Sequence, residues 1–264
     1  MNKSINALTL AGAAILLSQS AQAGPEHATL TLSDYAGGKA ACIAIYDRNA
    51  GQYLVHGMAQ CLERLSPCST FKIPHALIGL ETGVSSGPGD TRKWDGTVHS
   101  RTVQNRDHDL DSAIDDSIVW YFQEMAREVG PERMQQALDA FDYGNRDISG
   151  GQDRFWLSSS LQINALEQID FMDRLDRAAL PAAPENQATV RGMMAQEKNL
   201  PEGFSGELYA KTGSCIGAET DHGWFTGIYG RGPDSWVFAV NVKGKKQWGW
   251  QARKIAVEVL NDLP

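Results

Sequence analysis

The chain is 264 residues long, with 42% hydrophobic and 21% charged residues. This composition is that of a globular protein with a sizeable core rather than a disordered chain, and the length favours one domain or two lobes that share an interface. The formal net charge is −8 and no long run of Lys or Arg occurs, which argues against a nucleic-acid partner or an anionic membrane surface and leaves small molecules as substrates.

Residues 1–23 have the pattern of a secretory signal peptide. Lys3 supplies positive charge, a short apolar stretch covers residues 8–17, and a small-x-small cleavage site ends at Ala23. The apolar stretch is shorter than the ~20 residues that a bilayer requires, so an uncleaved anchor is the weaker alternative. We therefore expect a mature chain that begins at Gly24 and is secreted to the periplasm, with no membrane-spanning part.

Four cysteines form an even set without a C-x-x-C pair: Cys42, Cys61, Cys68 and Cys215. Export permits disulfides, and three connectivities are formally possible. Metal ligation by these four residues is not expected.

Both ends of the mature chain have the patterns of β-strands. Residues 40–46 and 53–56 are apolar runs on either side of a turn-rich stretch, and they predict a hairpin. Residues 207–210, 223–229 and 236–242 are β-branched and aromatic, with Gly, Pro and Asp at the joints. These three segments predict consecutive antiparallel strands.

The last segment predicts a helix whose apolar stripe lies against the sheet, and residues 73–200 are mostly helical in pattern. The sequence therefore predicts an α+β (mixed α/β) fold for residues 24–264. An antiparallel sheet lobe would come from about residues 24–72 and 205–264, and a helical lobe from about residues 73–204. The stripe of the last helix consists of Ala252, Ile255, Ala256, Val259 and Leu260.

The first candidate for chemistry is a Ser-Lys pair just before an apolar helical stripe. Ser69 and Lys72 stand three residues apart at the expected helix start, so their side chains share a face and the Lys nitrogen can approach the hydroxyl. Such a pair can act as nucleophile and base without histidine, and the helix N-terminus disfavours a protonated lysine. A capping Ser and a solvated Lys stay open as the alternative, because a chain of this length contains about one Ser-x-x-Lys by chance.

Two further motifs follow the pair. Residues 117–119 are Ser-Ile-Val at the start of a helical-looking segment, and residues 211–213 are Lys-Thr-Gly after a strand-like segment. In the order Ser-x-x-Lys, Ser-x-Val and Lys-Thr-Gly, the sequence resembles the class D, or OXA-type, serine β-lactamases. The resemblance covers essentially the whole mature chain, because Tyr-Gly-Asn at residues 143–145 and Phe-Trp-Leu at residues 155–157 fall where that family has its Tyr-Gly-Asn and buried-tryptophan motifs.

The resemblance implies a β-lactamase/transpeptidase-like fold and a role for each motif residue. Ser69 would attack the carbonyl of β-lactam antibiotics. Lys72, neutral in an apolar pocket, would react with carbon dioxide to form a carbamate that serves as general base, supported by the indole N–H of Trp156. Ser117 would relay a proton to the departing lactam nitrogen, while Lys211 would bias Ser117 and hold the substrate carboxylate.

Further residues would complete the site by the same resemblance. The backbone N–H groups of Ser69 and Ser214 would form the oxyanion hole, and Thr212 would add a hydroxyl beside the carboxylate. Val119 would line the pocket, with ordinary core packing as its alternative. Arg253 falls where the family often has a carboxylate-binding arginine, whose planar fork suits that task, and a surface arginine is the alternative.

The cysteines beside two motifs depart from the usual family pattern. Cys68 directly precedes the nucleophile, and Cys215 stands two residues beyond Lys-Thr-Gly. In the implied fold these segments are adjacent across the active site, so we predict a Cys68–Cys215 disulfide, which leaves Cys42 and Cys61 to pair. A bridge that closes so long a loop contributes on the order of 4–5 kcal/mol if unstrained.

The sequence offers neither a metal site nor a class A deacylation motif. The six histidines show no paired metal-ligand spacing, so no metal cofactor is expected. A Ser-Asp-Asn triplet and a convincing glutamate motif for a deacylating water are both missing. The histidines are His27, His56, His75, His99, His108 and His222.

Two other functions remain open at this point. A β-lactam sensor domain and a penicillin-binding D,D-peptidase share the catalytic motifs but acylate without rapid turnover. The sensor is normally fused to transmembrane and protease segments, and the peptidase usually carries extra domains or an anchor. Antibiotic turnover separates the enzyme from both. The sequence predicts neither the antibiotic spectrum nor the oligomeric state.

Overall fold

A computed structural model of the protein describes residues 30–196, 200, 204, 206–217, 221–232 and 234–263. The expected signal peptide, residues 1–23, lies outside the described residues. Thr31–Pro264 forms one compact unit. No helix within the described ranges has the length and apolar character needed to cross a membrane.

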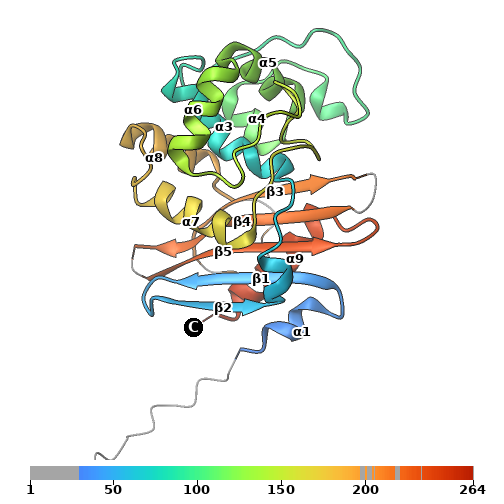
Figure 1. Cartoon of the computed structure of the whole chain (residues 1–264), viewed down its shortest axis with the longest axis vertical. Helices are drawn as coiled ribbons and strands as arrows, with labels where there is room; N and C mark the ends of the chain where they lie inside the picture. Colours follow the sequence, from blue (N-terminus) through green and yellow to red (C-terminus); the bar gives the residue numbers. More distant parts are fainter. Residues whose placement is uncertain are drawn as a thin grey trace, which may run out of the picture. The chain divides into compact units, whose positions relative to one another are not determined.

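This unit is built on a five-stranded antiparallel sheet with the strand order β2-β1-β5-β4-β3 (Figure 1). The N-terminal hairpin pairs with the last strand of the chain, which confirms that both ends of the chain build the sheet. β3 is left at one edge. The strands are β1 (Ala40–Asp47), β2 (Gln52–His56), β3 (Leu208–Cys215), β4 (His222–Arg231) and β5 (Asp234–Lys243).

Local sequence closes the β1–β2 hairpin, and the burial pattern of β1 shows how the sheet is covered. The Oδ1 atom of Asp47 accepts hydrogen bonds from the backbone N–H groups of Asn49 and Ala50, both at 2.9 Å, which closes the β1–β2 turn. Successive residues of β1, such as Ile43 and Ala44, are fully buried. Because successive side chains of a strand point to opposite faces, both faces of the sheet must be covered.

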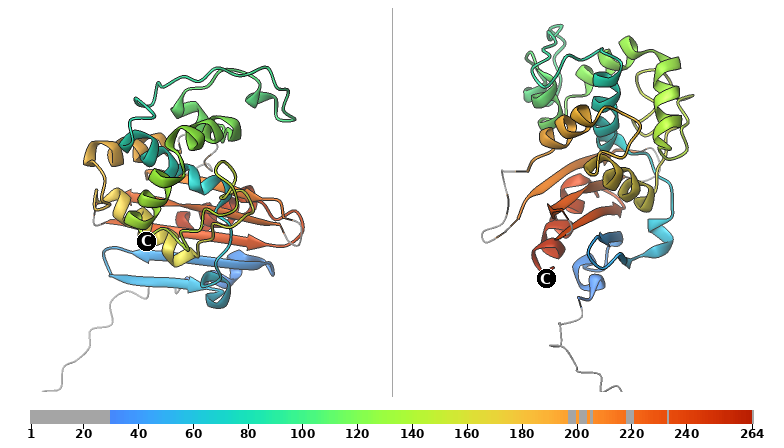
Figure 2. Two further views of the ribbon diagram at one scale, coloured as in Figure 1. Left: turned by 45° about the horizontal axis from the view of Figure 1, so that its top comes forward. Right: turned by 90° about the vertical axis from the view of Figure 1, so that its left-hand side faces the viewer.

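Helices cover these two faces (Figure 2). α9 (Gly249–Asn261) packs on β3, β4 and β5, together with the short α1 (Leu32–Ala36), and every residue of its predicted stripe is buried. α7 (Ala165–Asp176) packs on β1, β4 and β5 from the other side. Although α7 falls in the range expected for the helical lobe, it is a covering helix of the sheet.

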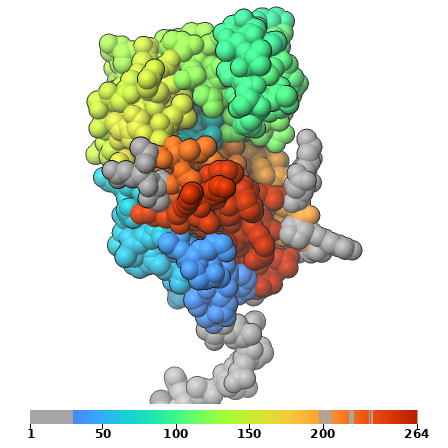
Figure 3. All heavy atoms as spheres, turned by 90° about the vertical axis from the view of Figure 1, so that its right-hand side faces the viewer, coloured from blue at the N-terminus to red at the C-terminus, as the bar shows by residue number. Residues whose placement is uncertain are grey.

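Most of the remaining helices gather beyond the β3 edge, around α3 (Lys72–Glu81), and Figure 3 shows this cluster stacked on the sheet layer, whereas the short α2 (Met58–Cys61) packs on β1. α3 contacts α4, α5 and α8, so that residues 72–79 are buried on all sides. The other helices are η1 (Cys68–Phe71), η2 (Thr102–Gln104), α4 (Leu110–Asp115), α5 (Val119–Val129), α6 (Pro131–Phe141) and α8 (Pro184–Met193).

Two boundaries differ from the expected ones by three residues or more, both at chemical motifs. β3 continues past Ala210 to Cys215, because each of its residues pairs with β4 up to that point. Ser69 does not lie in the α-helix but in the 3-10 turn η1, and α3 begins at Lys72. The backbone of Cys68 has a φ of 47°, in the left-handed region, so a regular helix cannot pass through it.

Candidate active site

The predicted nucleophile, Ser69, lies in a turn that is anchored on two sides. The backbone N–H of Cys68 donates to the carbonyl of Trp156 at 3.0 Å. The Oγ1 atom of Thr70 accepts a hydrogen bond from Nε2 of Gln168 on α7 at 3.0 Å. These bonds fix η1 against the loop that carries Trp156 and against α7, which positions the half-buried Ser69.

Lys72 is completely buried, and its Nζ donates a hydrogen bond to the Oγ of Ser69 at 3.0 Å. The same Nζ lies 5.4 Å from the centre of the Phe122 ring. Burial lowers the pKa of Lys72 well below its usual range, and repulsion from Lys211 and Arg101 lowers it further. The neutral amine is therefore favoured, which is the form that accepts a proton or attacks carbon dioxide.

A cluster of buried aromatic side chains lies beside this part of α3. Phe71, Phe155 and Trp156 are fully buried and pack on one another with ring centres 4.9 to 5.6 Å apart. Although Trp156 is fully buried, its Nε1 has no hydrogen-bond partner among the described residues. A buried N–H without a partner costs free energy, so this atom marks a place for an acceptor. We call the buried region formed by Lys72, these three rings and Phe122 the Lys72 chamber.

The Tyr-Gly-Asn motif holds the loop that carries Trp156. The Oδ1 of Asn145 accepts from the backbone N–H of Gln162, and its Nδ2 donates to the carbonyl of Ser160, both at 2.9 Å. Gly144 has a φ of 55°, and a Cβ added there would lie 2.2 Å from the carbonyl oxygen of Gln162. Only glycine fits this close approach.

β3 brings its outer edge against the nucleophile turn. A Cβ added to Gly213 would lie 2.7 Å from the carbonyl oxygen of Pro67, so strand and turn are in direct contact. The backbone N–H of Ala210 donates a hydrogen bond at 2.9 Å to the carbonyl of Met194, which lies outside the sheet. Because alternate residues of a strand share an edge, the N–H of Ser214 points to the same outer edge, toward the turn of Ser69.

Lys211 and Thr212 lie on β3 between that edge and the helical cluster. Lys211 is only 5% exposed, and this burial lowers its pKa to about 8. The negative charge of Asp115 acts against the shift, and the positive charge of Arg101 adds to it. A cavity of about 60 Å³ touches Lys211, Thr212 and Asp115. Near pH 7 Lys211 still carries its positive charge, as a carboxylate-binding group requires.

Ser117 lies in the turn between α4 and α5, with a left-handed backbone (φ 58°). The carbonyl of the preceding Asp116 accepts a hydrogen bond from Nη2 of Arg101 at 2.7 Å. Arg101 is also the cation that lowers the pKa of both Lys72 and Lys211. The turn that carries Ser117 is thus linked to the two lysines through Arg101.

Val119 and Arg253 lie on helices at the margin of the site. Val119 begins α5 one turn before Phe122, on the helix face that contacts the Lys72 chamber. Arg253 is half-buried on α9, one turn after Gly249. A Cβ added to Gly249 would lie 2.8 Å from the carbonyl oxygen of Gly213, so this face of α9 looks toward β3.

Both predicted disulfides are present in the structure. Cys68–Cys215 joins η1 to the end of β3, and Cys42–Cys61 joins β1 to α2. All four cysteines are buried. Because the first bridge adjoins Ser69, the nucleophile turn and the outer edge of β3 are covalently tied.

Arg101 is the site residue that the sequence analysis did not select. It lies in the long connection between α3 and α4, next to η2, outside every motif. No local pattern of residue types distinguishes it from other exposed arginines. Its charge acts on the two buried lysines because of the path of the connection, which only the fold reveals.

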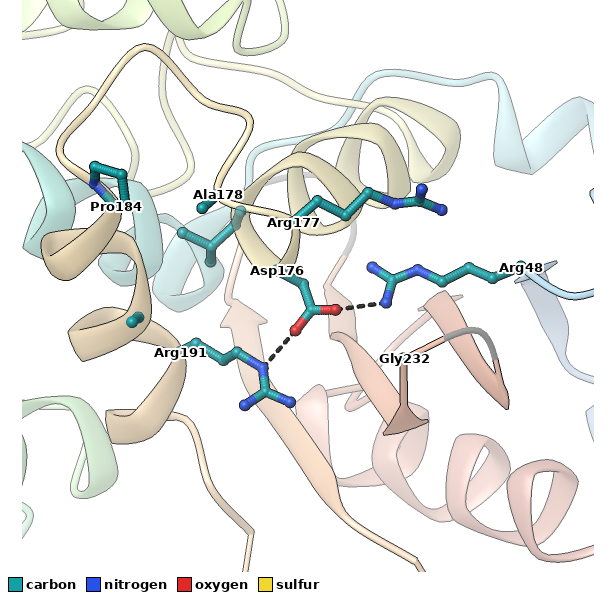
Figure 4. A pocket seen from close by; sticks show the side chains of 9 residues that line it. Arg48, Asp176, Arg177, Ala178, Pro184, Arg191 and Gly232 are labelled. Atoms are coloured by element: carbon teal, nitrogen blue, oxygen red, sulfur yellow. Dashed lines mark hydrogen bonds and ion pairs between the residues drawn. The ribbon is translucent and has the colours of Figure 1, made fainter.

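No group of three or more His, Cys, Asp or Glu side chains suited to a metal ion occurs among the residues that the structure describes. A pocket of about 610 Å³ lies elsewhere, at α7 and α8 (Figure 4). There Asp176 forms ion pairs with Arg48 and Arg191. None of the predicted site residues lines this pocket, so its volume does not locate the chemistry.

Comparisons with known proteins cover the region that carries these motifs. The protein-family model of the penicillin binding protein transpeptidase domain matches residues 41–263. The chain is 39% identical to the probable beta-lactamase YbxI of Bacillus subtilis, over 82% of this chain and 78% of that protein. It is 37% identical to beta-lactamase OXA-48 of Klebsiella pneumoniae, over 76% of this chain and 74% of that protein. The solved structure of the class D beta-lactamase BAT-2 aligns with a TM-score of 0.81 and 37% identity, over 88% of this chain and 94% of that one.

Proposed function

The chain belongs to the class D serine β-lactamases, and we propose that it hydrolyses β-lactam antibiotics through an acyl-enzyme on Ser69. The observation that carries this proposal is the buried amine of Lys72, 3.0 Å from the hydroxyl of Ser69. A serine next to a lysine that is held neutral is an activated nucleophile.

In acylation, the Oγ of Ser69 forms a bond to the lactam carbonyl carbon, and its proton passes to the base at Lys72. The carbonyl oxygen becomes negatively charged, and two backbone N–H groups stabilise that charge, one from Ser69 in η1 and one from Ser214 on β3. The ring C–N bond then breaks, and Ser117 passes a proton to the leaving nitrogen while the charge of Lys211 biases that transfer. Water hydrolyses the ester and restores Ser69.

We propose that Lys72 is N-carboxylated in the working enzyme. Its neutral Nζ forms a bond to the carbon of carbon dioxide and releases one proton to solvent. The fit rests on the lowered pKa of Lys72 and on the buried Nε1 of Trp156, a donor without an acceptor among the described residues. Carboxylated, Lys72 supplies an anionic general base for Ser69 and for the deacylating water, and no metal ion is needed.

The substrate carboxylate is assigned to Lys211, Thr212 and Arg253. Lys211 is positively charged at neutral pH because its pKa is about 8. Arg253 shares with Gly249 the face of α9 that looks toward β3, and its guanidinium can bind a carboxylate with two hydrogen bonds. Val119 would line the pocket from α5, one helical turn before Phe122.

We also propose that residues 1–23 direct export and that the enzyme works in the periplasm. The support is the signal-peptide pattern that ends at Ala23 and the presence of two disulfides, which form and persist in oxidising compartments.

The proposal is tested by mixing the purified mature protein with a penicillin and following ring opening by absorbance and adduct formation by peptide mass spectrometry. We expect many turnovers per enzyme, a transient adduct on the Ser69 peptide, and a loss of activity of about 10³-fold or more in Ser69→Ala. A lasting adduct without turnover would instead assign a sensor or a D,D-peptidase.

A further inference from the structure

His75 is a buried imidazole on α3 that the mechanism above does not use. Its side chain is fully buried, and neither Nδ1 nor Nε2 has a hydrogen-bond partner among the described residues. Lys72 and His75 stand three residues apart and so share a face of the helix. Buried polar groups in proteins nearly always have a partner, so the position of this ring requires a physical reason.

The ring of His75 borders the Lys72 chamber. Its centre lies 5.2 Å from the centre of the Phe122 ring, over which the Nζ of Lys72 also lies at 5.4 Å. It contacts Trp156 edge-on, with ring centres 5.1 Å apart. The imidazole therefore packs on the indole and on the ring that contacts the amine, within one buried apolar cluster.

His75 is neutral in this space. Burial, with repulsion from Lys72 and Arg92, lowers its pKa to about 3. Arg92 keeps its charge because it is paired with Glu128 and lies near Glu124. A neutral imidazole has one N–H donor and one acceptor nitrogen. Two buried donors, the imidazole N–H and the indole N–H of Trp156, thus lack an acceptor close to Lys72.

Carboxylation of Lys72 would bring acceptor oxygens into this space. Building on the proposed function, we propose that His75 is a positioning residue, whose neutral ring N–H donates a hydrogen bond to the carboxylate on Lys72 and so raises the carboxylated fraction. The unpartnered imidazole penalises the unmodified state, and the hydrogen bond relieves that penalty only after carboxylation. Part of the driving force for carboxylation is therefore stored in the buried ring.

The test compares two variants at this position in the mature protein. His75→Leu removes both ring nitrogens, whereas His75→Gln retains an N–H donor. Carboxylation is followed by the ¹³C NMR signal of the carbamate during titration with ¹³C-bicarbonate, and in parallel by the hydrolysis rate of a penicillin. A hydrogen bond to a charged group predicts that His75→Leu needs about ten-fold or more bicarbonate for half-maximal signal, and His75→Gln less than about three-fold more.

Saturating bicarbonate should restore the kcat of His75→Leu to near the wild-type value. A general packing defect would not permit this recovery. Phe141→Leu is the matched control, because it removes buried apolar volume where Phe141 packs on Phe171, outside the Lys72 chamber, without removing a donor. It should leave the bicarbonate midpoint unchanged.

If His75→Leu and the wild-type protein have the same bicarbonate midpoint, His75 does not have the proposed role, although the carbamate on Lys72 still stands. A shift of the same size in Phe141→Leu overturns it as well, since a general packing defect would then explain the effect. If the wild-type protein gives no carbamate signal at saturating bicarbonate, the proposed base is itself wrong, and so is the proposed role of His75.

Discussion

The Nζ of Lys72 lies 3.0 Å from the Oγ of Ser69, although the amine is completely buried and the hydroxyl is only half-buried. This arrangement puts the nucleophile at the opening of the site and its base at the floor. It arises because η1 ends where α3 begins, so that the two side chains project from one continuous turn. The chemistry we propose depends on the apolar floor, since solvent would return the lysine to its cationic form.

Replacement of Lys72 by alanine should remove the base from both half-reactions. Loss of a general base costs about 10²- to 10⁴-fold in rate, so kcat should fall by that order. If the same group serves deacylation, the acyl-enzyme should accumulate on Ser69 and be visible by intact-mass spectrometry. Unchanged turnover in Lys72→Ala would show that another residue is the base.

Trp156→Phe keeps an aromatic ring in the chamber but removes its N–H. The carboxylated state should lose one hydrogen bond, so the hydrolysis rate at ambient carbon dioxide should fall about ten-fold and recover with added bicarbonate. Trp120→Phe is the control, because the Nε1 of Trp120 donates to the carbonyl of Gln104 away from the chamber. A loss in Trp156→Phe that bicarbonate does not rescue would mean that the indole acts only by packing.

Removing either disulfide should lower stability, but only removing Cys68–Cys215 should also lower activity. Loop-closure entropy predicts a loss of about 5 kcal/mol without Cys68–Cys215, which are 147 residues apart, and about 3 kcal/mol without Cys42–Cys61, which are 19 apart. Urea unfolding of the two double alanine variants measures both values. Only the first variant should also lose activity, since its bridge ties β3 to the nucleophile turn. Equal activity in both would show that β3 is held by packing alone.

Titration of Lys211 should weaken substrate binding in alkali. Its pKa is about 8 in the folded protein, so kcat/KM for a carboxylate-bearing β-lactam should fall as the pH rises above about 8. The unfolded chain, with an ordinary lysine pKa of about 10.4, holds more protons between these values, so stability should rise with pH in the same window. Lys211→Arg, which stays charged, should lack the alkaline decline. A decline that persists in Lys211→Arg assigns it to another group.

Arg101→Ala should raise the pKa of Lys211 and of Lys72, because it removes a cation near both. The alkaline decline of kcat/KM should then move to higher pH. Arg106→Ala is a close control, since Arg106 pairs with the carboxylate of Asp116 at 3.0 Å and is not among the groups that shift either lysine. The same displacement in both variants would point to a general change of surface charge rather than to Arg101.

Much of the fold was predictable because both ends of the chain carry simple patterns. The apolar runs at residues 40–46 and 53–56, with a turn-rich stretch between them, predict β1 and β2, and the stripe from Ala252 to Leu260 predicts α9. The end of β3 was not predictable, because Gly213 and Ser214 have little intrinsic preference for strands and are extended only through pairing with β4. The start of α3 was missed for a similar reason, since the left-handed backbone of Cys68 is fixed by its neighbours.

The catalytic pair was readable from its spacing together with the two further motifs, because residues three apart meet on a helical turn but Ser-x-x-Lys also occurs by chance. The role of Arg101 was not, because a residue in a long connection gains its neighbours only through the path of the chain. The same holds for His75, which the sequence shows as one of six scattered histidines. Only burial without partners, seen in the structure, sets this histidine apart.

The most direct test of the central claim is steady-state hydrolysis of a penicillin by the purified mature protein, first in buffer freed of carbon dioxide and then with increasing bicarbonate. Carboxylated Lys72 as base and Ser69 as nucleophile predict sustained turnover that rises with bicarbonate and saturates. A single stoichiometric burst that bicarbonate does not extend would contradict this mechanism and identify a chain that binds β-lactams without destroying them.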